Sequence, residues 1–166
     1  MQMSETINDE SAGLNGSFEV VKSGLPVNWS FYSPNTVSDG DFSIEMDTND
    51  YVDGKQSLKF EVVECSSQGG LSSPGMMREF AINPGNLYKL SFWIKNEGCK
   101  FKISSGGVSP KTGDVKKLIQ TSDHIHEWKL YEYNIDISKE YESLRFEINI
   151  LQPGTFWIDN IKIDEV

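Results

Sequence analysis

The sequence predicts an all-β fold in which antiparallel strands form a sandwich or a barrel. Three observations support this prediction. Apolar and polar residues alternate over many short stretches, turn signals separate these stretches, and no convincing run of ten residues has apolar side chains at helical spacing. At 166 residues, of which 37% are hydrophobic, the chain has the size of one domain and enough apolar side chains for one core.

Five stretches alternate most clearly, namely 57–64, 87–96, 99–104, 130–137 and 144–151. Their inward side chains are predicted, in chain order, to be Leu58, Phe60, Val62, Tyr88, Leu90, Phe92, Ile94, Phe101, Ile103, Tyr131, Tyr133, Ile135, Ile137, Leu144, Phe146, Ile148 and Ile150. Turn signals separate the strands: DGK (53–55), NPGN (83–86), NEG (96–98), SSGG (104–107), PKTGD (110–114) and QPG (152–154). Trp29, Trp128 and Trp157 are expected in the core.

The final stretch, FWIDNIKIDEV (156–166), contains a conflict. Simple alternation puts Asp159 in the same row as Trp157, Ile161 and Ile163. A buried carboxylate is costly unless it is paired or bound to a metal. Either burial ends at Asp159, therefore, or this carboxylate has a cation partner.

The composition excludes several functions. Fifteen Lys and Arg against 25 Asp and Glu give a formal net charge of 15 − 25 = −10, which argues against nonspecific binding to nucleic acids or anionic lipids. No apolar run is long enough for a membrane-spanning helix. Residues 1–13 are polar and are expected to be a linker or disordered, with the folded domain over 14–166. Cys65 and Cys99 permit one disulfide or two free thiols, and both remain open.

The outward rows of three strands carry polar groups and one large aromatic side chain. They are Lys89, Ser91, Trp93 and Lys95; Lys100, Lys102 and Ser104; and Arg145, Glu147 and Asn149. A sugar ring stacks its apolar face on an aromatic side chain while its hydroxyls bond sideways, so an outward tryptophan among such groups favours a carbohydrate ligand.

The motif HIH (124–126), with Asp123 and Glu127 beside it, has residue types that suit zinc or copper. No third or fourth ligand is evident, and solvated loop residues are the favoured interpretation. The sequence has no phosphate-binding glycine loop, GxSxG elbow or HExxH helix.

An ordered series of short motifs gives a resemblance over residues 14–165. The motifs are NGSFE (15–19), PVNW (26–29), VDGKQSLKF (52–60), LYKLSFWIK (87–95), EWKLYEYNI (127–135), LRFEINI (144–150) and GTFWIDNIKI (154–163). This order resembles carbohydrate-binding modules of families four, nine and twenty-two. The resemblance implies a galactose-binding-like β-jelly roll, a structural calcium and a ligand face on the concave sheet.

The resemblance also implies a set of metal ligands. Ser17 would give a backbone oxygen, Glu19 and Asp159 would give carboxylates, and Lys55 or Gln56 would give a backbone carbonyl. Such hard oxygen ligands suit calcium, which would join the two ends of the domain. The alternative is that Glu19 and Asp159 are solvated carboxylates.

For the ligand face, the resemblance points to Tyr32, Arg78, Lys102, Arg145, Glu147 and Asn149. Trp93, on a strand expected between those of Lys102 and Arg145, is the predicted stacking platform. Basic residues stand here where cellulose- and xylan-binding modules carry neutral amides, which argues against a neutral β-glucan and leaves open an acidic or decorated glycan, or no sugar at all.

The function expected from these residues is noncatalytic binding of a polysaccharide or oligosaccharide. The resemblance implies an extracellular, cell-surface or periplasmic location, in a larger glycan-degrading protein or system. Two alternatives stay open: a structural or protein-interaction module without a sugar site, and a polysaccharide lyase or glycosidase on the same scaffold.

Overall fold

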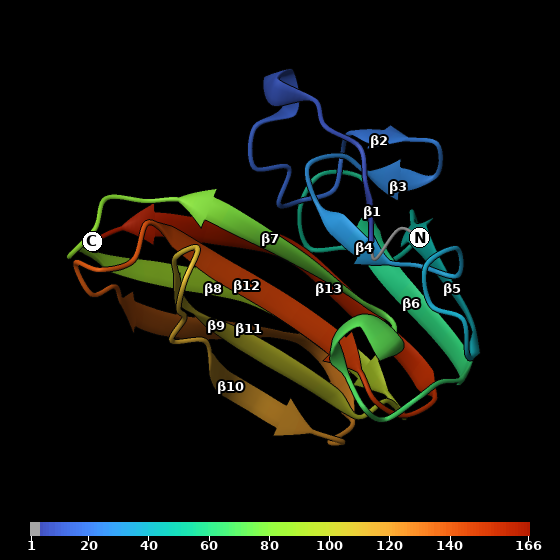
Figure 1. Cartoon of the computed structure of the whole chain (residues 1–166). Coiled ribbons are helices and arrows are strands. Elements are labelled where there is room, and N and C mark those ends of the chain that lie inside the picture. The colour runs from blue at the N-terminus through green and yellow to red at the C-terminus, as the bar shows by residue number, and fades with distance from the viewer. Residues whose placement is uncertain (1–3) are drawn as a thin grey trace.

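The computed structural model describes residues 4–166, which form a β-sandwich of two antiparallel sheets (Figure 1). The six-stranded sheet contains, in spatial order, β1 (Glu5–Thr6), β4 (Ser30–Tyr32), β7 (Gly75–Ala81), β12 (Ser143–Ile150), β9 (Phe101–Val108) and β10 (Lys116–Thr121). The five-stranded sheet contains β11 (Ile125–Asp136), β8 (Leu87–Glu97), β13 (Gly154–Glu165), β6 (Ser57–Glu64) and β5 (Asp41–Asp47). The predicted all-β sandwich is confirmed.

The remaining elements are short. A hairpin joins β2 (Val21–Lys22) to β3 (Leu25–Pro26), and two 3-10 turns, η1 (Glu10–Ala12) and η2 (Gly70–Ser72), lie in loops. In the part of the chain that the structure describes, no helix is long and apolar enough to cross a membrane.

The core lies between the sheets and contains the alternate side chains that the sequence predicts. Phe92, Phe101 and Phe146 are fully buried, and the Phe101 and Phe156 rings lie 4.8 Å apart. Burial of each such side chain contributes roughly 1.5–3 kcal/mol. Tyr131 and Tyr133, on the edge strand β11, are only half-buried.

The simple alternation predicted for the last strand is wrong. Phe156 and Ile158 face the core, so Trp157 lies on the outer face of the five-stranded sheet. The register then shifts between Asp159 and Lys162, where Asn160 has a φ of 53°. This bulge adds a residue and reverses the alternation, which returns Ile161 to the core.

The first thirteen residues do not form a free linker over their described part. Residues 1–3 lie outside the described residues, but β1 pairs with β4. The Asn28 side chain accepts a hydrogen bond from the Asp9 N–H at 2.8 Å and donates to the Asp9 carbonyl at 2.7 Å. Residues 5–12 therefore pack on the domain.

Both cysteines are free thiols. Cys99 is buried in the core, and this burial raises the pKa of its thiol to about 12. Cys65 is half-buried, and burial raises its pKa as well.

Candidate functional site

The outer face of the six-stranded sheet brings together five of the predicted ligand residues. We call it the β12 surface, and it consists of Tyr32, Lys102, Arg145, Glu147 and Asn149. Asn149 is paired in register with Lys102 on one side and Gly75 on the other, and Gly75 is also paired with Tyr32. Residues at even spacing on β12 point to the same face, which is why the sequence pattern finds them.

Two charges at the centre of this surface neutralise each other. Arg145 donates two hydrogen bonds to one Glu147 oxygen, from Nε at 3.0 Å and from Nη2 at 2.7 Å. Burial lowers the pKa of Arg145, but the hydrogen bonds and charge of Glu147 outweigh it and raise that pKa. The result is a fixed ion pair that presents both donors and acceptors.

One end of the β12 surface is covered by the loop that contains η2. The Asn149 amide donates to the Gly70 carbonyl at 3.0 Å, and Asn149 is only 2% exposed. Tyr32 is also 2% exposed, and burial together with the charge of Glu147 raises its pKa. Tyr32 therefore has no open ring face for a sugar in this conformation, whereas Lys102, Arg145 and Glu147 are half-exposed.

Trp93 lies on the opposite side of the molecule. The prediction that its strand runs between those of Lys102 and Arg145 is wrong, because β8 belongs to the five-stranded sheet. Trp93 is half-buried there, in a shallow depression of about 380 Å³ that Leu130, Asn160 and other side chains line. It cannot contact the same sugar unit as the β12 surface.

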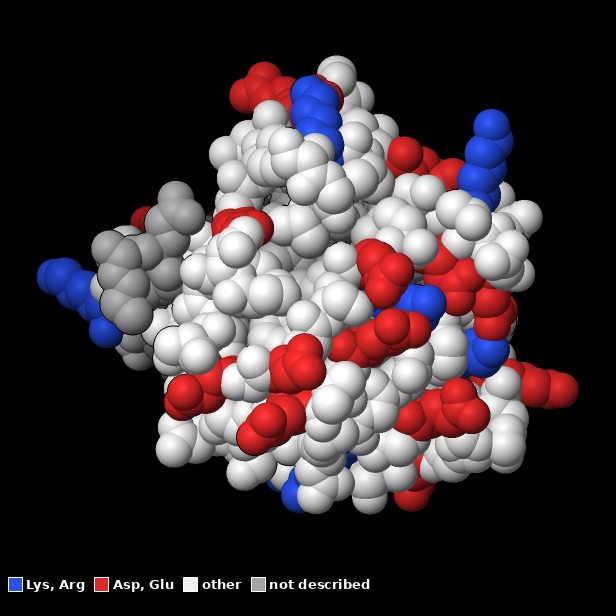
Figure 2. All heavy atoms as spheres, turned by 90° about the vertical axis from the view of Figure 1, so that its right-hand side faces the viewer, with Lys and Arg blue, Asp and Glu red and all other residues white. Residues whose placement is uncertain are grey.

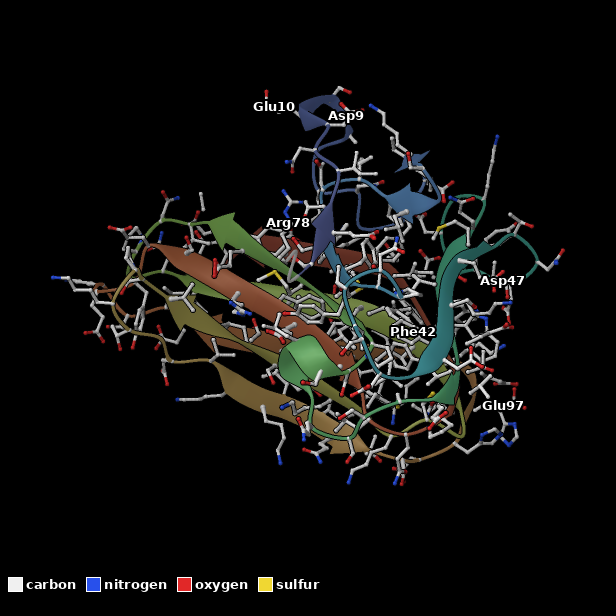
Figure 3. All side chains as sticks on the ribbon, turned by 45° about the vertical axis from the view of Figure 1, so that its right-hand side comes forward. Asp9, Glu10, Phe42, Asp47, Arg78 and Glu97 are labelled. Carbon is white, nitrogen blue, oxygen red and sulfur yellow. The ribbon has the colours of Figure 1, made fainter. Side chains whose placement is uncertain are left out.

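Arg78 faces the inner side of its sheet, because it is paired in register with the buried Phe146. Its guanidinium carbon lies 4.6 Å from the centre of the Phe80 ring and 5.8 Å from that of Trp29. Its Nη1 donates to the Leu14 carbonyl at 3.0 Å, beneath the N-terminal segment (Figure 3). Burial lowers the pKa of Arg78.

We expect Arg78→Ala to lower the free energy of unfolding by about 2 kcal/mol, because it removes a half-buried cation–π contact and a charged hydrogen bond. Urea denaturation measures this change, and Lys117→Ala on exposed β10 is the matched control. Glycan affinity should stay within about twofold of wild type, since such a structural cation makes no ligand contact. Unchanged stability with a large loss of affinity would restore Arg78 as a ligand residue.

The predicted metal ligands come from three segments that meet at one end of the sandwich. The Ile161 N–H donates to the Gly16 carbonyl at 2.9 Å, which joins the first segment to the last strand. A Cβ on Gly16 would lie 2.0 Å from the Ile161 carbonyl oxygen, so only glycine fits this approach. The Ser17 hydroxyl donates to the Asp53 carboxylate at 2.6 Å, which brings in the 52–56 turn.

Asp159 is fully buried in this junction, and backbone N–H groups surround it. Its Oδ2 accepts from Val52 at 2.8 Å and from Asp53 at 2.9 Å, while its Oδ1 accepts from Asn160 at 2.8 Å. Burial raises the pKa of Asp159 to about 6, although these hydrogen bonds act in the opposite direction. Both oxygens of the carboxylate thus accept hydrogen bonds, but these N–H donors carry no full positive charge to balance its negative charge.

The donor chemistry at this junction fits calcium. Glu19, Asp53 and Asp159 carry carboxylate oxygens, which are hard ligands of the kind that calcium takes. Lys55 takes part through its N–H, which donates to Glu19 at 2.7 Å. Among residues 4–166, no group of three His, Cys, Asp or Glu side chains has the arrangement of a metal site, so carbonyls and water would have to complete the coordination. The sequence reasoning missed Asp53, although it lies in the DGK turn already singled out.

Acidic side chains crowd the face that carries β5 and β6 (Figure 2). Two tryptophans expected in the core lie half-buried and donate to acids here. Trp157 Nε1 donates to Asp47 at 2.9 Å, and Trp128 Nε1 donates to Asp50 at 2.8 Å. Trp29 alone among the three is fully buried.

Comparison with solved structures shows the fold. The xylan-binding domain CBM22-1 of Xyn10C from Paenibacillus barcinonensis superposes with a TM-score of 0.62 at 12% identity, covering 91% of this chain and 92% of that one. A C-terminal family 22 carbohydrate-binding module of Clostridium thermocellum Xyn10B gives a TM-score of 0.58 at 16% identity, covering 96% of each chain.

The fold also occurs within larger proteins. The enzymatically active domain of tailspike protein 4 of bacteriophage CBA120 gives a TM-score of 0.64 at 16% identity, covering 92% of this chain and 21% of that one. No protein-family model and no curated protein sequence matches the chain. The chain thus has the jelly-roll sandwich of family 22 and family 4 carbohydrate-binding modules.

Proposed function

We propose that this chain binds a carbohydrate without catalysing its breakdown. The observation that supports this most directly is the β12 surface. It presents fixed hydrogen-bond donors and acceptors, drawn from several strands, on a fold shared with xylan-binding modules. A rigid sheet that holds polar groups in register suits sugar hydroxyls, which need several directional hydrogen bonds at fixed spacing.

The ion pair of Arg145 and Glu147 would orient the sugar. Arg145 Nη1, which lies 3.4 Å from the Glu79 carboxylate, would donate to ring hydroxyls or to a carboxylate substituent, and the second Glu147 oxygen would accept. Lys102 adds a positive charge on β9, the strand next to β12. Because Arg145 is already paired with Glu147 and Glu79, a preference for a glycan with acidic substituents over a neutral one would rest mainly on Lys102.

Replacement of Arg145 tests the site. We expect Arg145→Ala to weaken binding of glucuronate-substituted xylan by roughly tenfold or more, because a charged hydrogen bond is worth about 1.5–3 kcal/mol. Affinity gel electrophoresis against substituted and unsubstituted xylan measures the loss. Lys116→Ala, with its exposed side chain on β10, is the control for net charge. Equal retardation of wild type and Arg145→Ala would move the ligand away from the β12 surface.

Trp93 offers a second candidate surface for the same function, with an aromatic ring face and a polar rim on the other sheet. Trp93→Ala in the same gels separates the two surfaces, since a loss confined to this variant places the sugar on the five-stranded sheet.

One observation favours a module without a sugar site. The loop of η2 covers Asn149, and Tyr32 is also buried, so two members of the β12 surface are closed to a ligand. Absence of retardation by every glycan in a broad panel would favour this structural or protein-interaction function.

We also propose that calcium stabilises the junction of Glu19, Asp53 and Asp159. The domain would act outside the cell or at its surface, as one part of a larger glycan-degrading protein or system. The occurrence of this fold in xylanases and in a phage tailspike supports that setting.

A further inference from the structure

The HIH motif does not form a disordered loop. Ile125 is the first residue of β11, is paired in register with Asn96 of β8, and packs against the core. Because strand side chains alternate, His124 and His126 both project to the opposite side from Ile125. Both histidines are exposed.

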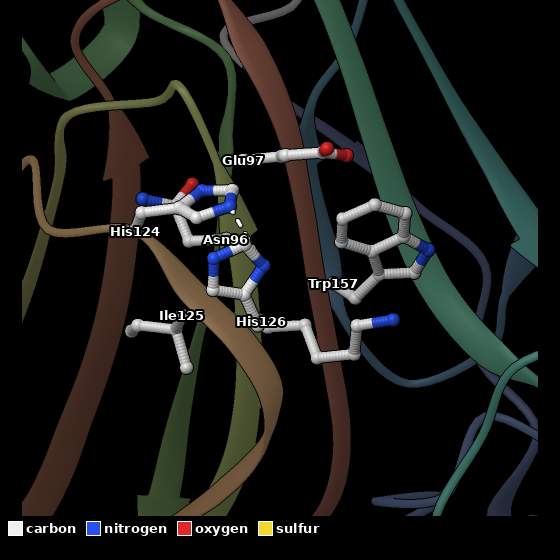
Figure 4. A pocket seen from close by; sticks show the side chains of 7 residues that line it. Asn96, Glu97, His124, Ile125, His126 and Trp157 are labelled. Carbon is white, nitrogen blue, oxygen red and sulfur yellow. Dashed lines mark hydrogen bonds between the residues drawn. The ribbon is translucent and has the colours of Figure 1, made fainter.

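The two imidazoles are close enough to share one ligand. His124 Nε2 lies 3.0 Å from His126 Nδ1, and the ring centres are 3.8 Å apart at an interplanar angle of 86° (Figure 4). A metal binds imidazole nitrogen at about 2.0–2.1 Å, so two nitrogens at a right angle around it are about 2.8–3.0 Å apart, and at a tetrahedral angle about 3.3–3.4 Å. The observed separation matches the right-angled pair.

The surrounding groups lower the cost of placing a cation there. The histidines line a pocket of about 120 Å³ together with Lys95, Asn96, Glu97 and Trp157. Lys95 is the positive charge in this lining, and it is already paired with the Asp50 carboxylate and lies over the Trp157 ring. Glu97 also lines the pocket and adds a negative charge, and its carboxylate points toward the Trp157 side in Figure 4.

Asn96 fixes the start of the motif. Its amide donates to the Asp123 carbonyl at 2.9 Å and to the Cys99 carbonyl at 2.8 Å, which holds the residue just before His124. Its Oδ1 is buried and has no hydrogen-bond partner among the described residues. The backbone that carries the histidine pair is therefore anchored to β8.

We propose that His124 and His126 form a two-histidine binding site for a divalent transition-metal ion, with water completing the coordination. The ion takes the place of the proton that the two ring nitrogens share. A right-angled pair of imidazoles suits the tetragonal geometry of Cu²⁺, which also stands at the top of the affinity order for first-row divalent metals. The ion would lie at the start of β11, beside the register shift against β8 between Ile125 and Lys129. This site is separate from the calcium junction and from the β12 surface.

Titration with Cu²⁺ tests the proposal, using the whole chain with calcium in excess so that oxygen sites are occupied. Trp157 lines the pocket, so bound Cu²⁺ should quench its fluorescence. We expect His126→Ala and His124→Ala each to weaken Cu²⁺ binding by roughly tenfold or more, and Glu97→Gln to weaken it less. Glu127→Gln, which removes a neighbouring carboxylate outside the pocket, is the matched control and should bind as wild type does.

Electron paramagnetic resonance gives a readout specific to the ligands. Wild type should show coupling of Cu²⁺ to two imidazole nitrogens, and the His124→Ala, His126→Ala double variant should lose it while keeping its far-ultraviolet circular dichroism spectrum. Any Cu²⁺ binding that the double variant retains is due to side chains other than these two histidines. Equal Cu²⁺ affinity in wild type and the double variant overturns the proposal, as does a spectrum without nitrogen coupling.

Discussion

We expect Asp159→Ala to lower the free energy of unfolding by about 2–4 kcal/mol, which corresponds to a fall in melting temperature of roughly 5–15 °C. The reason is that three backbone N–H groups point at this carboxylate. Alanine leaves them without an acceptor in a junction where Asp159 is fully buried. The cost of such orphaned donors, rather than the loss of one favourable contact, makes the effect large.

Asp159→Asn separates the acceptor role from the charge. The carbonyl oxygen of asparagine can still accept from Val52 and Asp53, but its NH₂ group faces the Asn160 N–H and cannot accept from it. The loss in free energy of unfolding should therefore be about half that of Asp159→Ala. The amide also has no charge to desolvate, whereas burial raises the pKa of Asp159 to about 6. Chemical denaturation in the presence of a chelator measures both variants. If Asp159→Ala unfolds at the wild-type denaturant concentration, water replaces the carboxylate and the junction is not a buried network.

The sequence predicts the core of this fold well because burial on one face of a strand imposes a period of two. The apolar side chains of a strand are buried together only when they point to the same face. Alternation therefore identifies the buried residues directly, for example Phe92, Ile94, Phe146 and Ile148. The β12 surface follows from the same rule, since Arg145, Glu147 and Asn149 are the complement of that buried row.

The rule fails where a local backbone feature or a long-range partner decides the outcome. The bulge at Asn160 changes the alternation within one strand, and the pattern of apolar residues does not predict it. Alternation also shows that Trp93 points outward without showing which sheet contains its strand. The cover over Asn149 depends on how the η2 loop folds back, and the anchoring of Arg78 depends on carbonyls more than sixty residues away.

The second large effect concerns calcium, and it follows from the charge at the same junction. Glu19 accepts from the Lys55 N–H in the turn that contains Asp53. The pKa of Asp159 is raised by burial and by the nearby Asp53 charge. A bound divalent cation would favour the ionised forms of all three carboxylates. At a free calcium concentration about one hundred times the dissociation constant, the gain in stability is about 2.7 kcal/mol. We therefore expect calcium to raise the melting temperature of chelator-treated protein by roughly 5–11 °C, measured by calorimetry.

Glu19→Gln is the variant that decides whether this stabilisation arises at the junction. Glutamine keeps an oxygen that can accept from the Lys55 N–H, so without calcium the variant should unfold within about 1 kcal/mol of wild type. With calcium it should lose most of the rise in melting temperature, because a carboxylate ligand has become a neutral amide. Glu61→Gln, in the exposed acidic row of β6, is the control and should keep the full rise. A full calcium effect in Glu19→Gln would place the ion elsewhere. No effect in wild type would leave Asp159 held by its backbone N–H groups alone.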